Sequence, residues 1–476
     1  MPDARNLLLR GGTVIDGDGA RRADVLVVGE RIAAVGPNLE SDSAQVIDAG
    51  GAYVIPGAID VHTHFDLQVG AVRSADDFTS GTIASACGGT TCVIDFAGAG
   101  REPWTEALAT WHQRADASAV VDFGFHLTVT ELPDSLDGAR ARFREFAEHG
   151  VTSVKLYMAY PERLMVDDAT LGRALAASVE TGVRVMVHAE DGAEIERRAA
   201  DALRRGVIGP AAITQVKPPS VEAAAITRAA GLARQAGAQI YVVHLSSAEG
   251  LGAIAAARAA GADVRAETCP QYLYLDAASL EDPSTGQDFV CSPPIRHEGD
   301  REALWEALAA GGVDLVSTDH CPFTPADRRR GTAARPGGWR NFIEIPGGLP
   351  GVETRLALVY QGVVDGRLTL ERWVEVTAGA PARMFGLDSR KGSLRAGLDA
   401  DVVVFDPRAT RRLSAATLHS RSGQTPYEGM ELAGWPALTL SRGRVVARDG
   451  EPFEATPGWG RFVPRSRSLA RPDTAR

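Results

Sequence analysis

The chain has 476 residues, 45% of them apolar and 6% aromatic, which is enough to bury the core of one large domain and a smaller companion. Its formal net charge of −11 argues against a broad nucleic-acid surface, which would need clustered lysine and arginine. A short basic tail (Arg461, Arg465, Arg467, Arg471) fits a solvated terminus or a subunit arm better.

The ends and the cysteines indicate where the protein works. The first residues, MPDARNLLLRGG, contain only a short apolar run, which predicts neither a signal peptide nor a membrane span. The cysteines are odd in number, far apart and without a CxxC pair, at positions 87, 92, 269, 291 and 321. This usage is typical of a reducing compartment, so we expect a cytoplasmic protein without membrane or nucleic-acid partners.

The two ends of the chain resemble each other. Residues 7–15, 24–35 and 45–54 are short β-branched runs joined by Gly and Asp turns, and 401–406 and 437–447 have the same character. Chain ends commonly meet at a domain surface. We therefore predict one small β-sandwich domain built from residues 1–54 and 386–476.

The middle, residues 55–385, alternates apolar β-branched runs with Ala-rich amphipathic stretches such as 222–237 and 248–261. The predicted strands are 54–61, 91–96, 120–127, 151–158, 183–188, 240–244, 263–267 and 313–318. Eight such repeats predict a (β/α)₈ barrel of the TIM type. An open doubly wound sheet is the alternative, but no G-x-G-x-x-G or P-loop sequence follows any strand to support a nucleotide site.

Polar residues gather where the predicted strands end. His62 and His64 follow the first barrel strand, His188 and His244 end two others, and Asp319 follows the last. A single histidine at a strand end is more often a hydrogen-bonded structural residue. Five such residues at one face of a barrel predict a metal site, because catalytic groups collect at the carboxyl ends of the strands. Imidazole and carboxylate ligands suit Zn²⁺, Mn²⁺ or Co²⁺ rather than Ca²⁺.

Lys155 lies inside a predicted strand between Val154 and Leu156. An ammonium buried beside metal cations is unfavourable unless the amine is neutral or modified. Addition of CO₂ would give N6-carboxylysine, an anionic ligand able to bridge two ions. The alternative is a lysine that extends to water from the strand end.

Ordered blocks of the sequence resemble the cyclic amidohydrolases, and among them the dihydropyrimidinase/D-hydantoinase branch. The blocks are VIPGAIDVHTHFD, KLYMAY, VHAEDG, YVVHLSSAEG, ETCPQYLYLD, VCSPPIR and STDHCPF, followed by PARMFGLDSRKGSLRAGLDADVVVFDP and YEGMELAGWP. They span nearly the whole chain. The resemblance implies the same fold, a barrel with a β-sandwich formed by both termini, and a homotetramer assembled from dimers.

The resemblance also implies roles for individual residues. His62, His64 and Asp319 bind one divalent ion, His188 and His244 bind the other, and carboxylated Lys155 bridges them. The two ions, most simply Zn²⁺, lower the pKa of a bridging water, and the resulting hydroxide attacks a ring carbonyl.

The remaining matched positions concern the substrate. Asp319 moves the proton to the leaving nitrogen, and Tyr160 stabilises the tetrahedral oxyanion. The backbone of Ser292 holds the amide edge of the ring. Gly347 stands where relatives commonly have Asn, and its backbone retains the same N–H and C=O groups.

Phe65, Tyr157 and Leu164 match side chains that line the pocket for the substituent outside the ring, and favour an apolar or small substituent. A dihydroorotase would instead place an Arg close after its HxH pair, and Arg73 lies further along.

These observations predict ring opening of dihydropyrimidines or hydantoins to N-carbamoyl amino acids. An allantoinase is the alternative enzyme, suggested by Gly347-Gly348. A non-catalytic scaffold relative is the alternative of another class, but such proteins have lost metal ligands, and all six positions are filled here.

Overall fold

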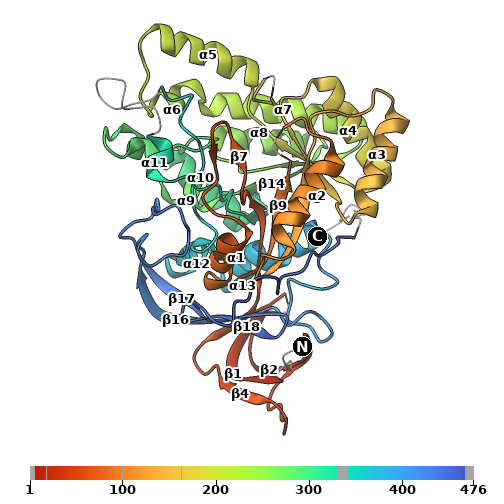
Figure 1. Cartoon of the computed structure of the whole chain (residues 1–476), viewed down its shortest axis with the longest axis vertical. Helices are drawn as coiled ribbons and strands as arrows, with labels where there is room; N and C mark the ends of the chain where they lie inside the picture. Colours follow the sequence, from red (N-terminus) through yellow and green to blue (C-terminus); the bar gives the residue numbers. More distant parts are fainter. Residues whose placement is uncertain (1–5, 18, 99, 162, 330–340, 467–476) are drawn as a thin grey trace.

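The computed structural model describes residues 6–17, 19–98, 100–161, 163–329 and 341–466. A barrel surrounded by helices makes up one end of the molecule and a separate sheet makes up the other (Figure 1). Within the described residues, no helix is long and apolar enough to cross a membrane.

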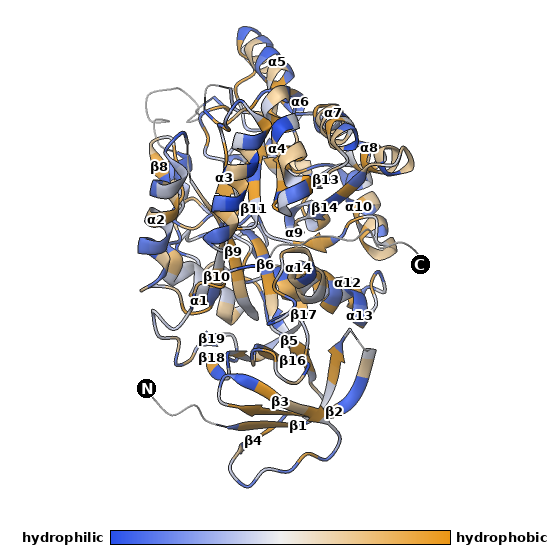
Figure 2. Ribbon diagram, turned by 90° about the vertical axis from the view of Figure 1, so that its right-hand side faces the viewer, coloured by the Kyte–Doolittle hydropathy of each residue, from blue (hydrophilic) through white to orange (hydrophobic). Residues whose placement is uncertain are grey.

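Eight parallel strands form the barrel wall in the order β15-β14-β13-β12-β11-β10-β9-β6. They are β6 (Ala58–Thr63), β9 (Thr90–Ala97), β10 (Asp122–Thr128), β11 (Ser153–Tyr157), β12 (Arg184–His188), β13 (Gln239–Val242), β14 (Asp263–Thr268) and β15 (Leu315–Val316). The strands carry mainly hydrophobic residues, whereas the surrounding helices alternate hydrophobic and hydrophilic faces (Figure 2). The predicted barrel is confirmed.

The wall closes between β15 and β6. The fully buried guanidinium of Arg355 donates to the carbonyls of Ile59 and Val316, at 3.0 and 2.8 Å. Beyond β15, His320 pairs with Thr63 in a parallel bridge. These contacts bring the end of the last strand beside the end of the first.

Helices cover the outside of the barrel and its ends. They are α1 (Phe78–Cys87), α2 (Trp104–Ala115), α3 (Leu136–Glu148), α4 (Asp168–Thr181), α5 (Gly192–Arg204), α6 (Ala212–Val216), α7 (Pro219–Ala236), α8 (Ala248–Ala259), α9 (Pro270–Tyr274), α10 (Glu298–Ala310), α11 (Pro325–Arg328), α12 (Arg355–Val364), α13 (Leu370–Val374) and α14 (Ala380–Met384). Helix α7 illustrates the local logic, because Pro219 occupies its first turn and Gly237 ends it in the left-handed conformation. Its buried face carries Ala225, Ala229 and Ala233 at helical spacing.

Both chain ends build the second sheet, as predicted. Its order is β19-β18-β17-β16-β5-β1-β2-β3, and β4 pairs with β1. The strands are β1 (Leu7–Asp16), β2 (Gly19–Val28), β3 (Arg31–Gly36), β4 (Gln45–Asp48), β5 (Tyr53–Pro56), β16 (Val402–Arg412), β17 (Glu431–Ser441), β18 (Arg444–Arg448) and β19 (Glu451–Pro452). The two ends meet where β5 pairs with β16. A hairpin of β7 (Gln68–Val69) and β8 (Val72–Arg73) stands apart from both sheets.

The prediction of one strand over 54–61 was wrong. The chain changes sheet at Gly57, so that β5 belongs to the terminal sheet and β6 to the barrel. Only glycine fits at this corner, because a Cβ on Gly57 would lie 2.1 Å from the hydroxyl of Thr91.

The interpretation of the basic tail as solvated was wrong for Arg465 but holds for Arg461, whose side chain is 54% exposed. Arg465 is buried and donates to Ser153 Oγ at 2.7 Å and to the carbonyl of Phe125. Phe462 pairs with Phe123 of β10 in an isolated bridge. The chain therefore returns to the barrel before it ends. Arg467 and Arg471 lie outside the described residues.

Candidate metal centre and substrate cavity

The structure brings the six predicted metal ligands together at the carboxyl ends of the barrel strands. His62 lies in β6 with His64 just beyond it, Lys155 lies in β11 and His188 ends β12. His244 and Asp319 follow β13 and β15. All six residues are buried.

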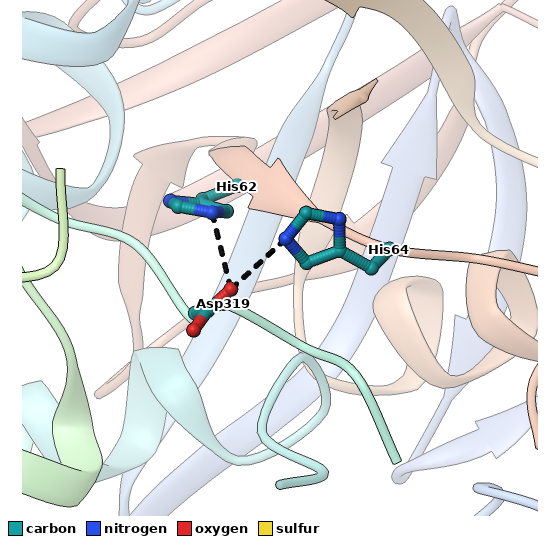
Figure 3. A group of neighbouring side chains, drawn as sticks. All are labelled: His62, His64 and Asp319. Carbon is teal, nitrogen blue, oxygen red and sulfur yellow. Dashed lines mark ion pairs between the residues drawn. The ribbon is translucent and has the colours of Figure 1, made fainter. Parts of the chain in front are cut away.

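The first group is His62, His64 and Asp319, whose side chains converge on one point (Figure 3). One oxygen of Asp319 lies 3.1 Å from His62 Nε2 and 3.0 Å from His64 Nε2. Burial would raise the pKa of Asp319, but the two imidazoles hold it well below its usual range. The carboxylate is therefore ionised at neutral pH, as a metal ligand must be.

The second group is His188 and His244, with His188 Nδ1 only 2.9 Å from His244 Nε2. Burial lowers the pKa of both residues, that of His244 well below its usual value, so both rings are neutral. Neutral imidazoles with converging nitrogens can offer their lone pairs to one cation.

Lys155 lies between the two groups. Its Nζ is 2.9 Å from His62 Nε2 and 4.3 Å from the ring centre of Phe96. Burial lowers the pKa of the amine to about 8, although Asp319 and Glu267 act in the opposite direction. A neutral amine is the form that reacts with CO₂.

Three of the site residues have strained backbones. Tyr160, His244 and Asp319 have φ angles of 65°, 40° and 52°, in the left-handed region that non-glycine residues rarely occupy. Each such residue costs about 1–3 kcal/mol and persists where the surrounding structure enforces it, which is typical of active sites.

The residues that orient the ligands were not predicted from the sequence. Glu267 in β14 accepts a hydrogen bond from His62 Nδ1, and Tyr241 donates to its other oxygen at 2.7 Å. Glu190 accepts from His188 Nε2 at 2.8 Å. Carboxylates in this position fix which ring nitrogen faces a metal. Two features of the sequence could have indicated them. Glu267 is a charged residue inside a predicted barrel strand, and Glu190 lies two residues after His188.

A cavity of about 860 Å³ opens from this centre. Tyr157, Tyr160, Leu164, Ser292 and Gly347 all line it, as expected. Tyr160 donates to Ser292 Oγ at 2.8 Å.

The expectation that Phe65 lines the pocket was wrong, because its side chain is fully buried and does not line the cavity. Its ring packs against Phe78 and His320, and its backbone N–H donates to Asp95 at 2.8 Å. The chain has left β6 by this point, so strand alternation no longer sets the direction of the side chain. Leu67, Val69 and Val72, from the hairpin and the segment before it, line the cavity instead.

The two backbone segments expected to hold the ring lie side by side. A Cβ on Gly347 would lie 3.9 Å from Ser292 N, and Gly348 N donates to the carbonyl of Val290 at 2.9 Å. The buried guanidinium of Arg328 donates to the carbonyls of Val290 and Pro346, at 3.2 and 3.1 Å, and ties the segments together.

Comparison with known proteins agrees with this geometry. The amidohydrolase family model matches residues 53–446. The chain belongs to the amidohydrolase family. It is 41% identical to the D-hydantoinase of Geobacillus stearothermophilus over 97% of this chain and 96% of that protein. It is 40% identical to the D-hydantoinase of Streptomyces coelicolor over 96% and 98% of the two chains. The crystal structure of dihydropyrimidinase from Brevibacillus agri superposes with a TM-score of 0.93 at 39% identity, covering 98% of this chain and 100% of that one. The predicted resemblance to the dihydropyrimidinase/D-hydantoinase branch is confirmed.

The residues of this amidohydrolase fit two divalent ions. His62, His64 and Asp319 supply two imidazoles and a carboxylate, and His188 and His244 supply two neutral imidazoles. His244 Nδ1 is buried and has no hydrogen-bond partner among the described residues. A second acidic group, Asp122, Asp399 and Asp401, already surrounds the ammonium of Lys391, which is 2.8 Å from Asp122 and 2.5 Å from Asp401. That cluster is a structural ion-pair network rather than a metal site.

Proposed function

We propose that this amidohydrolase opens the ring of dihydropyrimidines or hydantoins by metal-dependent hydrolysis and gives N-carbamoyl amino acids. The observation that carries the proposal is a cavity lined by five of the six ligand side chains together with Tyr160, Ser292 and Gly347. The sixth, His62, contacts Asp319 at 3.1 Å beside this cavity. The full-length similarity to D-hydantoinases supports this choice of ring.

His62, His64 and Asp319 would hold one ion, His188 and His244 the other, and Lys155, as N6-carboxylysine, both. Bound divalent ions supply hydroxide near neutral pH and polarise the ring carbonyl. Zn²⁺ suits the imidazole-rich donor set, as do Mn²⁺ and Co²⁺.

The chain's own residues then handle charge and protons. Asp319 is ionised and reaches the cavity, so it can accept the proton of the nucleophile and pass it to the leaving nitrogen. The Tyr160 hydroxyl is a donor within the cavity and can turn from Ser292 to the developing oxyanion. The backbone groups at Ser292 and Gly347 hold the amide edge of the ring.

The shape of the cavity favours a substrate with an apolar substituent. Beyond the metal centre its walls include Val69, Leu164, Ile195, Phe342 and Ile345. Arg73 is the arginine that follows the HxH pair at a distance and could have bound a dihydroorotate carboxylate. It pairs instead with Asp66 at 2.8 Å and does not line the cavity.

We further propose a cytoplasmic homotetramer. The five cysteines are buried free thiols, which a reducing compartment preserves. Sedimentation at several protein concentrations would test the assembly, and a stable monomer would contradict it.

A hydrolysis panel combined with metal analysis tests the proposed function. The panel contains hydantoin, 5-alkyl and 5-aryl hydantoins, dihydrouracil, allantoin and dihydroorotate. We expect two metal ions per chain, and fastest turnover of apolar 5-substituted hydantoins or dihydrouracil. Preference for allantoin would favour an allantoinase. Negligible bound metal would favour a scaffold, and two bound metals without turnover of any compound would reject the proposal.

A further inference from the structure

Lys217 places a buried ammonium in the substrate cavity, in a position outside the sequence blocks that resemble the cyclic amidohydrolases. Its side chain is 9% exposed, and it lines the cavity at the end of α6. The backbone around it is fixed, because its N–H donates to Ile213 O at 2.9 Å, Arg296 donates to its carbonyl, and Pro218 and Pro219 follow. The fold therefore fixes the position from which the Lys217 side chain enters the cavity.

The ammonium joins the metal centre to the oxyanion donor. Lys217 Nζ donates to Glu190 Oε2 at 2.7 Å and to Ser292 Oγ, and lies 5.2 Å from the ring centre of Tyr160. The same oxygen of Glu190 accepts from His188 Nε2 at 2.8 Å. One cation thus neutralises a fully buried carboxylate that touches a metal ligand.

The hydrogen bonds of Ser292 show what this cation does. A serine hydroxyl donates one hydrogen bond and accepts two. Ser292 Oγ donates to Glu190 at 3.1 Å and accepts from Tyr160 at 2.8 Å and from Lys217. Its capacity is therefore filled, with Lys217 and Tyr160 as its two donors.

Oxyanion stabilisation requires the Tyr160 proton to leave Ser292. With Lys217 in place, Ser292 keeps a strong cationic donor when Tyr160 turns away. Without Lys217, Ser292 would have Tyr160 as its one remaining donor among these contacts. Glu190 would also lose its lysine partner and become a buried carboxylate whose charge is uncompensated, with hydrogen bonds from His188 and Ser292 alone among these contacts.

We propose that Lys217 is a positioning residue for this step, which releases the Tyr160 hydroxyl to the oxyanion by holding Ser292 and Glu190. The inference rests on the proposed function. It differs from a direct role in binding a substrate carboxylate, for which the ammonium would have to leave Glu190.

A double-mutant cycle tests it. Lys217→Met and Lys217→Arg are made in the wild type and in Tyr160→Phe, and each protein is loaded with metal and assayed on the best hydantoin of the panel. We expect Lys217→Met to lower kcat about 10–100-fold, the order expected for a displaced catalytic group, while KM changes little. In Tyr160→Phe the same substitution should cost far less, because the proton that it controls is gone. Lys217→Arg should recover most of the activity.

Three results would overturn the proposal. Equal losses of kcat in both backgrounds would show that Lys217 does not act through Tyr160. A change confined to KM would make it a substrate ligand. A metal content below that of the wild type, with kcat per bound metal unchanged, would make it a support for His188.

Crystal structures of metal-loaded Lys217→Met and Lys217→Arg give a readout that does not depend on turnover. We expect the hydroxyls of Tyr160 and Ser292 to move in the Met variant by more than the ~0.5 Å that catalytic geometry tolerates, and to stay in place in the Arg variant. Unchanged hydroxyl positions in the Met variant would refute the inference even if the wild type hydrolysed none of the panel. If Lys217→Met does not fold, the Arg variant carries the test, since it keeps the charge and must keep both hydroxyl positions and kcat.

Discussion

Glu267 offers a test of how the protein orients His62, one of the proposed metal ligands. Its carboxylate accepts from His62 Nδ1 and from the Tyr241 hydroxyl, and so directs His62 Nε2 towards Lys155 and Asp319. Loss of such a carboxylate–histidine partner typically costs 10–100-fold in metal affinity, about 1.4–2.7 kcal/mol.

The hydrogen bonds of Glu267 predict a different loss of metal affinity for each substitution. In Glu267→Gln the amide oxygen can still accept from His62, and the NH₂ can donate to the Tyr241 oxygen. The substitution therefore removes mainly the negative charge, and we expect metal affinity to fall about tenfold. Glu267→Ala leaves both partners buried and unpaired, and we expect about 100-fold. Tyr241→Phe keeps the carboxylate and serves as the matched control, with a smaller loss than either.

Competition with a chromogenic chelator at fixed pH measures these affinities. The reasoning is refuted if Glu267→Ala binds metal as tightly as the wild type. It is also refuted if Tyr241→Phe loses as much affinity as Glu267→Ala, because the effect would then come from packing around the pair.

Three further predictions concern the proposed bridging lysine, the oxyanion donor and the pH dependence of folding stability. Lys155→Ala should abolish tight binding of two metals, measured by metal analysis after dialysis; two retained ions with normal turnover would rule out the carbamate. Tyr160→Phe should lower kcat roughly 10²–10³-fold in the hydantoin assay, as loss of one oxyanion donor does, and an unchanged rate would remove Tyr160 from the mechanism. Glu353, 2.9 Å from His419 Nδ1, raises the pKa of that half-buried imidazole against the opposing effect of burial. The folded protein therefore binds more protons than the unfolded chain just above pH 6.5, so this contribution to stability is complete below about pH 6.5 and is lost as pH rises through the folded pKa. Urea midpoints of the wild type should fall more steeply over this range than those of His419→Gln, and parallel curves would contradict the assignment.

The sequence predicted the parts of the site that depend on strand ends. His62, His188 and Asp319 follow β-branched runs, and the carboxyl ends of parallel barrel strands lie at one rim. The barrel order itself therefore brings these side chains together.

The parts that depend on the path of loops were not predictable in this way. Lys217 follows a helix of five residues and reaches the cavity because the α6–α7 turn folds inward. Phe65 is only one residue beyond His64, yet it points into the core because the backbone turns towards Asp95. Neither direction is encoded in a periodic pattern.

The return of the C-terminal segment to the barrel has a consequence for biosynthesis. Arg465 and Phe462 pack against β10 and β11, yet roughly 340 residues separate them from β10 along the chain. At ordinary rates of translation, β10 waits about 20–70 s on the ribosome for the segment that covers it. During that interval the buried polar groups at Ser153 and Phe125 have no guanidinium to bind. Truncation or fusion near residue 465 should therefore reduce the yield of folded protein before it affects the chemistry at the opposite end of the barrel.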